Sequence, residues 1–340
     1  MLAQSDAFAA LGAAWHNQTP SLRSARGVVM DYEKFIEEQI ADIKRTVGGE
    51  KAITALSGGV DSAVTTVLGH RALGNRLKTV FIDNALMRQG EPQQVVDTFA
   101  SLGIRVEKVA AQEEFLDALA GLTDPEEKRQ AITDTFYSKV FSRIVKESRA
   151  KFLLHGTILT DIEETVAGIK RQHNILAQLG VDTRQSYGYS VIEPLKTLRK
   201  DDVREVAKAL DLPAEIYQRI PFPGPALATR IVGEVTRERL ATVRKATAIV
   251  EQELGDSGAF QYMAVLLNDR ATGIRNNKRE FGRIIVIRCI ESTDARTCAA
   301  TELSWEKLHH ICSRIVSEIP DVNRCLYDLT PKPPATIEYI

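Results

Sequence analysis

The sequence predicts an α/β fold in which a parallel twisted sheet, with helices on both faces, is followed by a smaller α+β domain. Along residues 51–210, short apolar segments alternate with segments of helical spacing. This alternation is typical of parallel sheets with right-handed crossovers. The 340 residues allow about two domains of ordinary size. The segment PFPGP at 221–225 holds three prolines and one glycine, and it marks the expected domain boundary.

The first domain is predicted to span residues 30–220. Its first helix is expected at 32–47, with Asp31 as the N-cap residue. Short apolar segments predict strands at 51–56, 78–83, 104–109, 151–155 and 191–195. Helical spacing predicts helices at 60–73, 89–102, 125–148 and 200–210. Residues 168–190 are polar and poorly periodic, which indicates a mobile loop or lid.

The second domain is predicted to span residues 221–340 as an α+β unit. Helices are expected at 236–254 and 304–319, strands near 262–267 and 283–290, and two short strands at the end. Residues 1–29 lack the basic and apolar regions of a signal peptide. We interpret them as a loose N-terminal extension ahead of a natural start near Met30. One additional packed helix around Phe8–Trp15 is the alternative.

Composition excludes several classes of function. Lys and Arg number 44 and Asp and Glu 45, so the net charge of −1 argues against general binding to nucleic acid or to a membrane surface. No apolar run approaches the roughly 18–20 residues that span a bilayer. The four cysteines, which are few for a secreted scaffold, begin at Cys289 and include no C-x-x-C pair. We therefore expect a cytoplasmic protein without a zinc ribbon.

The most informative segment is Ser57-Gly58-Gly59-Val60-Asp61-Ser62, between a predicted strand and a predicted helix. Two glycines allow a sharp turn with unshielded N–H groups. These donors point the same way as the N-terminus of the following helix, so with the serine hydroxyls they form a cradle for an anion. The segment matches neither G-x-x-x-x-G-K-[ST] nor G-x-G-x-x-G. A tight turn followed by a helix cap is the alternative interpretation.

This segment resembles the pyrophosphate loop (PP-loop) of the N-type ATP pyrophosphatases, which cleave ATP between its α and β phosphates. Further segments are similar to the ATP-pyrophosphatase and dimerisation parts of the GMP synthase family, over about residues 32–340. They are FIDNALMR (81–88), HGTILTDIEE (155–164), EPLKTLRKDDVREVAKALDLP (193–213), PFPGPALATRIVGEV (221–235) and RCLYDLTPKPPATIEYI (324–340). The family converts xanthosine 5′-monophosphate (XMP) to GMP.

The resemblance implies a reaction and a set of residues. An oxygen of XMP attacks the ATP α-phosphate, and ammonia then displaces AMP from the adenylated intermediate, with Mg²⁺ as cofactor. The implied catalytic residues are Asp61, Lys170 and Lys196. The implied ATP and pyrophosphate site contains Ser57, Gly58, Gly59, Val60, Asp61, Ser62, Gly156 and Lys196. The implied metal ligands are Asp61, Asp161 and Glu164. The implied nucleotide site contains Arg88, Arg230, Gln261, Lys332, Thr336, Ile337 and Glu338.

Each implied role has a structural alternative. In these alternatives Asp161 and Glu164 only open a helix, Lys170 and Lys196 are solvated charges, and the arginines form surface salt bridges. Residues Lys332 to Glu338 would then belong to a frayed tail. Against fraying, the Pro-Pro pair stiffens the approach to the β-prone segment TIEYI.

No cysteine precedes Cys289, so the chain lacks the nucleophile of a glutaminase domain. Ammonia is expected from a separate glutamine amidotransferase subunit or free in solution, and the resemblance implies a homodimer. The chain departs from the family pattern at 159–161, 172–174, 219–227, 276–281, 294–297 and 339–340. A paralogue that adenylates a different substrate is therefore the main alternative. A tRNA-thiolation enzyme lacks support, since no cysteine lies near the ATP loop, and a non-catalytic nucleotide-binding paralogue would not require Asp61 and Lys196.

Overall fold

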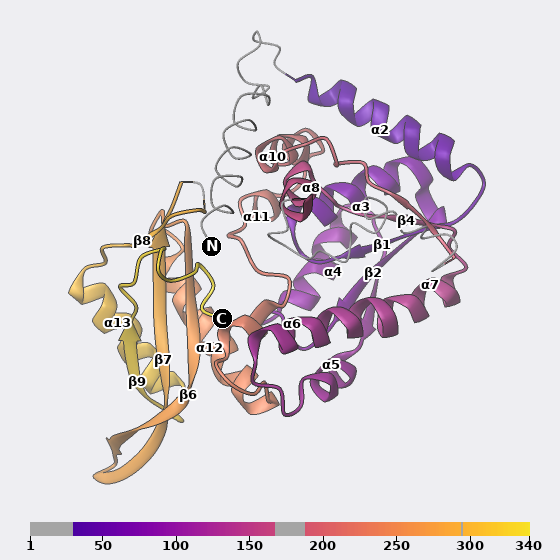
Figure 1. Ribbon diagram of the computed structural model, residues 1–340. Helices are drawn as coiled ribbons and strands as arrows, with labels where there is room; N and C mark the ends of the chain where they lie inside the picture. The colour runs from indigo at the N-terminus through magenta and orange to yellow at the C-terminus, as the bar shows by residue number, and fades with distance from the viewer. Residues whose placement is uncertain (1–29, 167–187, 294) are drawn as a thin grey trace, which may run out of the picture.

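The computed structural model describes residues 30–166, 188–293 and 295–340. Within these ranges the chain forms a body built on a parallel sheet and, beside it, a C-terminal unit built on a second sheet (Figure 1). The predicted α/β class is confirmed. The predicted N-terminal extension and nearly all of the predicted lid lie outside the described residues.

The first sheet is parallel throughout, and its strand order places the first strand at the centre. The order is β3-β2-β1-β4-β5. The strands are β1 (Ala52–Leu56), β2 (Leu77–Asp83), β3 (Val106–Ala110), β4 (Phe152–Leu154) and β5 (Ser190–Ile192). The chain progresses outward from β1 to β3 and then returns across β1 to β4. A crevice forms beyond the carboxyl ends of the strands where the direction reverses, and ligands bind there in open α/β sheets.

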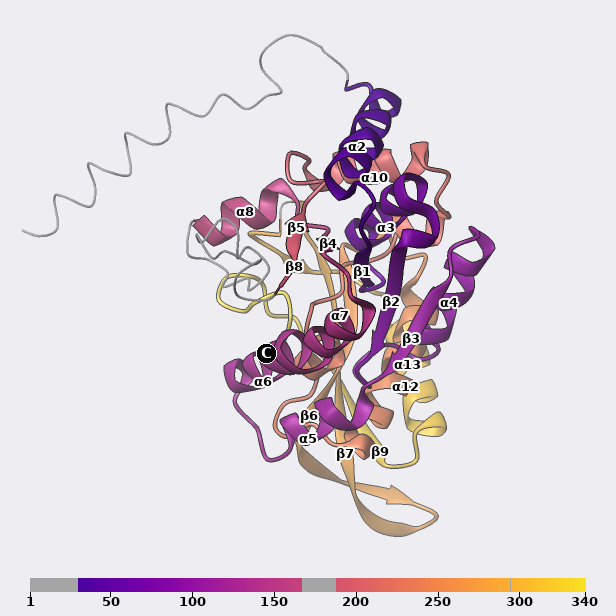
Figure 2. The same ribbon diagram turned by 90° about the vertical axis from the view of Figure 1, so that its right-hand side faces the viewer.

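Helices cover both faces of this sheet, as predicted. They are α2 (Tyr32–Val47), α3 (Val60–Leu73), α4 (Glu91–Ser101), α5 (Gln112–Leu119), α6 (Pro125–Asp134), α7 (Ser142–Ser148), α8 (Leu159–Val166), α10 (Lys200–Ala209) and α11 (Ala214–Tyr217). Right-handed crossovers require α3 and α4 on one face and α6 and α7 on the other, because the direction of progress reverses after β3. Figure 2 shows this arrangement. Asp31 caps α2, its carboxylate accepting from the N–H of Lys34 at 3.0 Å.

Three local details differ from the predictions. The predicted helix over 125–148 is continuous, but its middle, Thr135–Phe141, has π-helical hydrogen bonding (η2). The short helices α5 and α11 were not predicted, because eight and four residues are too few to show a helical period. In the described ranges, the 3₁₀ turns Gly74–Arg76 (η1) and Ala226–Arg230 (η3), also absent from the predictions, are the remaining helical elements of the parallel-sheet body and the segment after it.

In the C-terminal unit, helices pack against a second sheet. Its elements are α12 (Arg237–Leu254), β6 (Gln261–Arg275), β7 (Lys278–Glu291), β8 (Ala299–Ala300), α13 (Trp305–Glu318) and β9 (Val322–Tyr327). β7 pairs antiparallel with β6 and β8 and parallel with β9. β6 and β7 are longer than predicted, because they continue as an exposed two-stranded ribbon that projects beyond the helices (Figure 1). Asn276 and Asn277, both with positive φ, form its turn.

The expectation of two short strands at the end is partly wrong. β9 forms, whereas residues 333–340 contain no strand, and the segment pairs with the sheet only through the bridge between Cys298 and Lys332. One cluster of buried apolar side chains runs from the first sheet into the C-terminal unit, so the two parts share a core. A division at 221–225 stays a prediction. None of the helices in the described ranges is both long and apolar enough to cross a membrane.

Candidate active site

The glycine-rich loop lies at the carboxyl end of β1, where the sheet order predicts a binding crevice. Ser62 Oγ accepts from the N–H of Ser57 at 3.2 Å, lies 3.1 Å from Ser57 Oγ, and donates to Gly59 O at 2.9 Å. Gly59 caps α3 in an extended conformation, and among the described residues no side chain caps this helix end. The first N–H groups of α3 therefore point into the crevice as donors for an anion.

Two glycines allow close contacts that any side chain would prevent. Gly58 has φ +80°, and a Cβ there would lie 2.7 Å from Arg219 Nη1 and 2.9 Å from Glu91 Oε1. A Cβ on Gly156 would lie 2.9–3.1 Å from backbone atoms of Asp61 and Ser62. The structure thus packs the turn after β4 directly onto the start of α3, and a larger residue at 156 would displace the backbone of the loop.

Asp61 lies in the first turn of α3 with one oxygen paired and one free. Lys200 Nζ donates to Oδ2 at 2.6 Å. Oδ1 is buried and has no hydrogen-bond partner in the described ranges. Burial raises the pKa of Asp61, while the charge and hydrogen bond of Lys200 oppose the rise and Asp161 adds to it. An unpaired buried carboxylate oxygen is costly unless a ligand satisfies it.

A cavity of about 600 Å³ opens beside the loop. This is large enough for a nucleotide. Its walls include the loop, His155, Gly156, Asp161 and Lys200, and aromatic side chains from η2 and the segment after α11. Lys196, which the sequence favours as a phosphate ligand, is exposed and does not line this cavity, whereas Lys200 does. Lys200 lies four residues after Lys196 in the same segment, 193–213, and this proximity is the only indication in the sequence that Lys200 belongs to the site.

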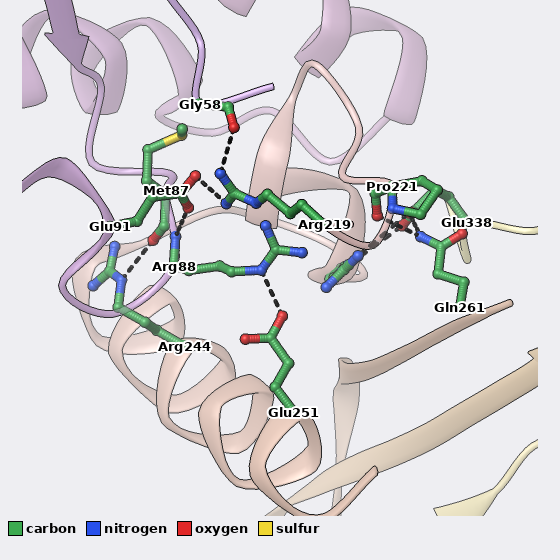
Figure 3. Close-up of polar contacts among 11 residues, drawn as sticks. Gly58, Met87, Arg88, Glu91, Arg219, Pro221, Arg244, Glu251, Gln261 and Glu338 are labelled. Atoms are coloured by element: carbon green, nitrogen blue, oxygen red, sulfur yellow. Dashed lines mark hydrogen bonds and ion pairs between the residues drawn. The ribbon is translucent and has the colours of Figure 1, made fainter. Parts of the chain in front are cut away.

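A second group of predicted residues meets at the start of β6. The Glu338 carboxylate accepts from Gln261 Nε2 at 2.6 Å and from Nε and Nη2 of Arg230, both at 3.4 Å. Figure 3 shows Gln261 and Glu338 beside Pro221. Arg230 is only 1% exposed. Three residues that are far apart in the sequence therefore form one cluster, in which Arg230 and Gln261 are buried and Glu338 is partly exposed.

Two arginines of this region flank an aromatic ring and keep donors free. The guanidinium carbons of Arg88 and Arg230 lie 3.8 and 4.8 Å from the ring centroid of Phe222, within the range of cation–π contacts. Nη1 of each arginine is buried without a hydrogen-bond partner among the described residues. Such an unsatisfied guanidinium donor suits an anionic ligand such as a monophosphate. No sequence pattern indicates a role for Phe222.

The remaining predicted residues of the C-terminal segment are held by other groups. Lys332 Nζ donates to Ala295 O at 2.8 Å. Arg288, which is 1% exposed, donates to Thr336 O at 2.8 Å and to Ile337 O at 3.1 Å, and pairs with Asp328. The alternative of a frayed tail is therefore wrong. No sequence pattern pointed to Arg288. Lys170 and the side chain of Glu164 lie outside the described residues.

The burial of His155 predicts that the protein loses stability as the pH falls. Its Nδ1 lies 2.8 Å from Thr157 Oγ1, which donates to Glu193 at 2.7 Å, and burial lowers the pKa of His155 from 6.5 to about 4. At a pH between these two pKa values, the unfolded chain binds more protons than the folded chain. The free energy of unfolding therefore falls as the pH falls through this range, by up to about 1.4 kcal/mol per pH unit. Urea unfolding at pH 7 and pH 5 should show a smaller loss for His155→Gln than for wild type. The exposed His309→Gln should behave as wild type, and an equal loss in both variants would contradict the assignment.

Comparisons with known proteins identify relatives of this chain. The family model described as NAD synthase matches residues 28–227, and that described as GMP synthase C terminal domain matches residues 248–339. Among the curated relatives are three proteins named as the B subunit of glutamine-hydrolyzing GMP synthase. The Archaeoglobus fulgidus protein is 50% identical over 91% of this chain and 100% of its own length. The Methanopyrus kandleri protein is 46% identical over 92% and 100%, and the Pyrococcus furiosus protein is 47% identical over 91% and 97%.

Proposed function

Because this chain belongs to the family of GMP synthase B subunits, we propose for it the reaction of that family, the ATP-dependent amination of XMP to GMP. The chain is accordingly a ligase that uses ATP. The observation that carries this conclusion is the 50% identity to one such B subunit over the whole length of that relative. The finer steps, in which XMP is adenylated, pyrophosphate leaves, and ammonia displaces AMP, are part of the proposal.

The loop is proposed to hold the ATP phosphates. Negative charge grows on the departing pyrophosphate, so catalysis needs fixed donors and positive charge at that point. The free N–H groups at the start of α3, the hydroxyls of Ser57 and Ser62, and the ammonium of Lys200 lie around one cavity and supply them. Lys196 and Lys170 remain proposed phosphate ligands. These groups position the phosphates without a covalent step on the protein, as in other phosphoryl and nucleotidyl transfers.

Mg²⁺ is proposed to accompany ATP. Oδ1 of Asp61, which has no hydrogen-bond partner among the described residues, is an oxygen ligand of the kind this cation prefers. The negative charge of Asp161 is near enough to raise the pKa of Asp61. Within residues 30–166, 188–293 and 295–340, no three His, Cys, Asp or Glu side chains converge as metal ligands. Asp61, with Asp161 and Glu164, would therefore share the ion with the ATP phosphates. When bound, the ion neutralises phosphate charge.

XMP is proposed to bind at the arginine cluster. The free donors of Arg88 and Arg230 suit its monophosphate, since a guanidinium can bond two phosphate oxygens at once. The Glu338 carboxylate, oriented by Gln261, can accept from a purine N–H. Lys332 and the backbone at Thr336 and Ile337 complete the proposed site.

The ammonia comes from a separate glutaminase subunit. The relatives are named as the B subunit of a glutamine-hydrolysing enzyme, and this chain has no cysteine before Cys289. We further propose a homodimer formed through the C-terminal unit, because Ile274 and Phe281 on its β ribbon are 77% and 70% exposed. A cytoplasmic location is proposed because all four cysteines are free.

The alternative of a paralogue with another substrate rests on the departures from the family pattern. Residues 276–281 form the turn region of the projecting ribbon, away from the parallel-sheet body (Figure 1). Ala295, by contrast, accepts from Lys332 at 2.8 Å, so the departure at 294–297 adjoins the proposed nucleotide site. Substrate identity therefore needs a direct test.

The test incubates the purified chain with ATP, Mg²⁺, ammonium and XMP and measures pyrophosphate and GMP. We expect equal amounts of both products. Inosine monophosphate, which lacks the attacked oxygen, is the matched control and should release no pyrophosphate. ATP binding without GMP formation would refute the proposed reaction, and pyrophosphate release with a different acceptor would establish the paralogue.

A further inference from the structure

Buried polar contacts join the ATP loop to the proposed XMP site (Figure 3). Arg219 Nη1 donates to Gly58 O at 2.7 Å, and Nη2 of the same side chain pairs with Glu91. The Glu91 side chain is 4% exposed, and its second oxygen accepts from the backbone N–H of Arg88 at 3.0 Å. Arg88 in turn lies over Phe222 and pairs with Glu251. The carboxylate of Glu91 is thus the single connection between the loop and Arg88 on this path.

The same side chains form a wall between two cavities. A second cavity, of about 390 Å³, lies among α4, α11 and α12. Gly58, Glu91 and Arg219 line both this cavity and the ATP cavity. The wall is closely packed, because even a Cβ on Gly58 would lie under 3 Å from both side chains. Arg219 is joined to Gly58 by its hydrogen bond and to Glu91 by its ion pair, so a movement of Glu91 can reach Gly58 through Arg219.

The contact with Gly58 sets the direction of a donor in the loop. The peptide that joins Gly58 to Gly59 is planar, so holding its oxygen fixes its N–H on the opposite side. That N–H donates to Ser57 Oγ, with 3.4 Å between nitrogen and oxygen. Arg219 consequently helps to hold the Gly59 N–H against Ser57 Oγ, one of the hydroxyls of the loop.

We propose that Arg219 and Glu91 are positioning residues that couple ATP binding at the PP-loop to XMP binding at Arg88, an inference that rests on the proposed function. An anion held by Arg88 orders the backbone that contacts Glu91, and Glu91 orders Arg219 and the Gly58 peptide. Bound XMP therefore raises the affinity for ATP, and bound ATP raises the affinity for XMP. By linkage, the two affinities change by the same factor.

Arg219→Lys tests this coupling. Lysine keeps the positive charge beside Glu91 but lacks the fork that contacts Gly58 and Glu91 together. Calorimetry with Mg²⁺ measures the Kd of α,β-methylene-ATP with and without saturating XMP. In wild type, XMP should lower this Kd. In Arg219→Lys the Kd without XMP should rise about tenfold, and the effect of XMP should disappear. Arg237→Lys, whose side chain forms an exposed ion pair with Glu113, is the matched control and should match wild type.

Two further measurements keep the outcomes separate. Glu91→Gln, which preserves shape but removes the charge, should also lose the XMP effect, and it decides the question if Arg219→Lys does not fold. GMP formation by wild type is measured in parallel. If wild type forms GMP normally but XMP does not change its Kd for α,β-methylene-ATP, the coupling alone is overturned. The same holds if XMP changes this Kd equally in wild type and variant. Absence of GMP formation overturns the proposed function instead.

Discussion

Asp61→Ala is expected to lower XMP-dependent pyrophosphate release at least about a hundredfold, because it removes an oxygen ligand at the point where phosphate charge must be neutralised. Oδ1 of Asp61 has no partner among the described residues, and this is the strongest indication of that role, since a buried carboxylate oxygen is rarely left without one. The fold should survive, because the Lys200 ammonium that loses its partner is part-exposed and can be hydrated. Steady-state kinetics with a pyrophosphate readout, together with the thermal midpoint, measures both expectations.

Asp61→Asn separates shape from charge. Asparagine preserves the volume and one oxygen, so a loss close to that of alanine would assign the effect to the negative charge. Asp42→Asn, in an exposed ion pair with Arg45 on α2, is the control and should retain full turnover. If both Asp61 variants retained wild-type turnover while folded, this residue would have no part in holding the metal or the phosphates.

Arg230→Gln is expected to raise the KM for XMP about a hundredfold, the usual scale for truncating a buried charge partner. The KM for ATP should change little in comparison, because Arg230 does not line the cavity at the loop. The KM for XMP is expected to rise for two reasons. Glutamine removes both the free Nη1 donor and the contact with Phe222. The two KM values are measured separately with ammonium as the nitrogen source.

The controls for Arg230 address folding. Its loss leaves Glu338 with Gln261 as a remaining partner. If Arg230→Gln does not fold, the double variant Arg230→Gln/Glu338→Gln removes the unbalanced carboxylate and restores a testable protein. Arg237→Gln, at the exposed start of α12, should leave both KM values unchanged. Equal rises in the KM for ATP and XMP would show a general structural role for Arg230 rather than a role in binding XMP.

The parallel sheet and the location of the glycine-rich loop could be predicted because their signals are local. Ser57 to Ser62 hold two adjacent glycines between an apolar strand and a helix, and such a turn follows from backbone sterics alone. Most helices and strands were predicted within a few residues for the same reason. The short helices α5 and α11, and the exposed ends of β6 and β7, show weak periodicity and were missed or shortened.

The sequence by itself determined the fold class, the glycine-rich turn between β1 and α3, and the absence of a cysteine ahead of Cys289. It could not identify Lys200 as the partner of Asp61, Arg219 as the residue that holds Gly58, or Arg288 as the residue that holds the C-terminal segment. These pairs are separated by 139, 161 and 49 residues respectively. Contacts of this kind depend on how the sheets and helices pack in three dimensions, and a single sequence contains no local pattern that records them. The tertiary structure decided them, because only packing buries these charges and makes each of them need a particular partner.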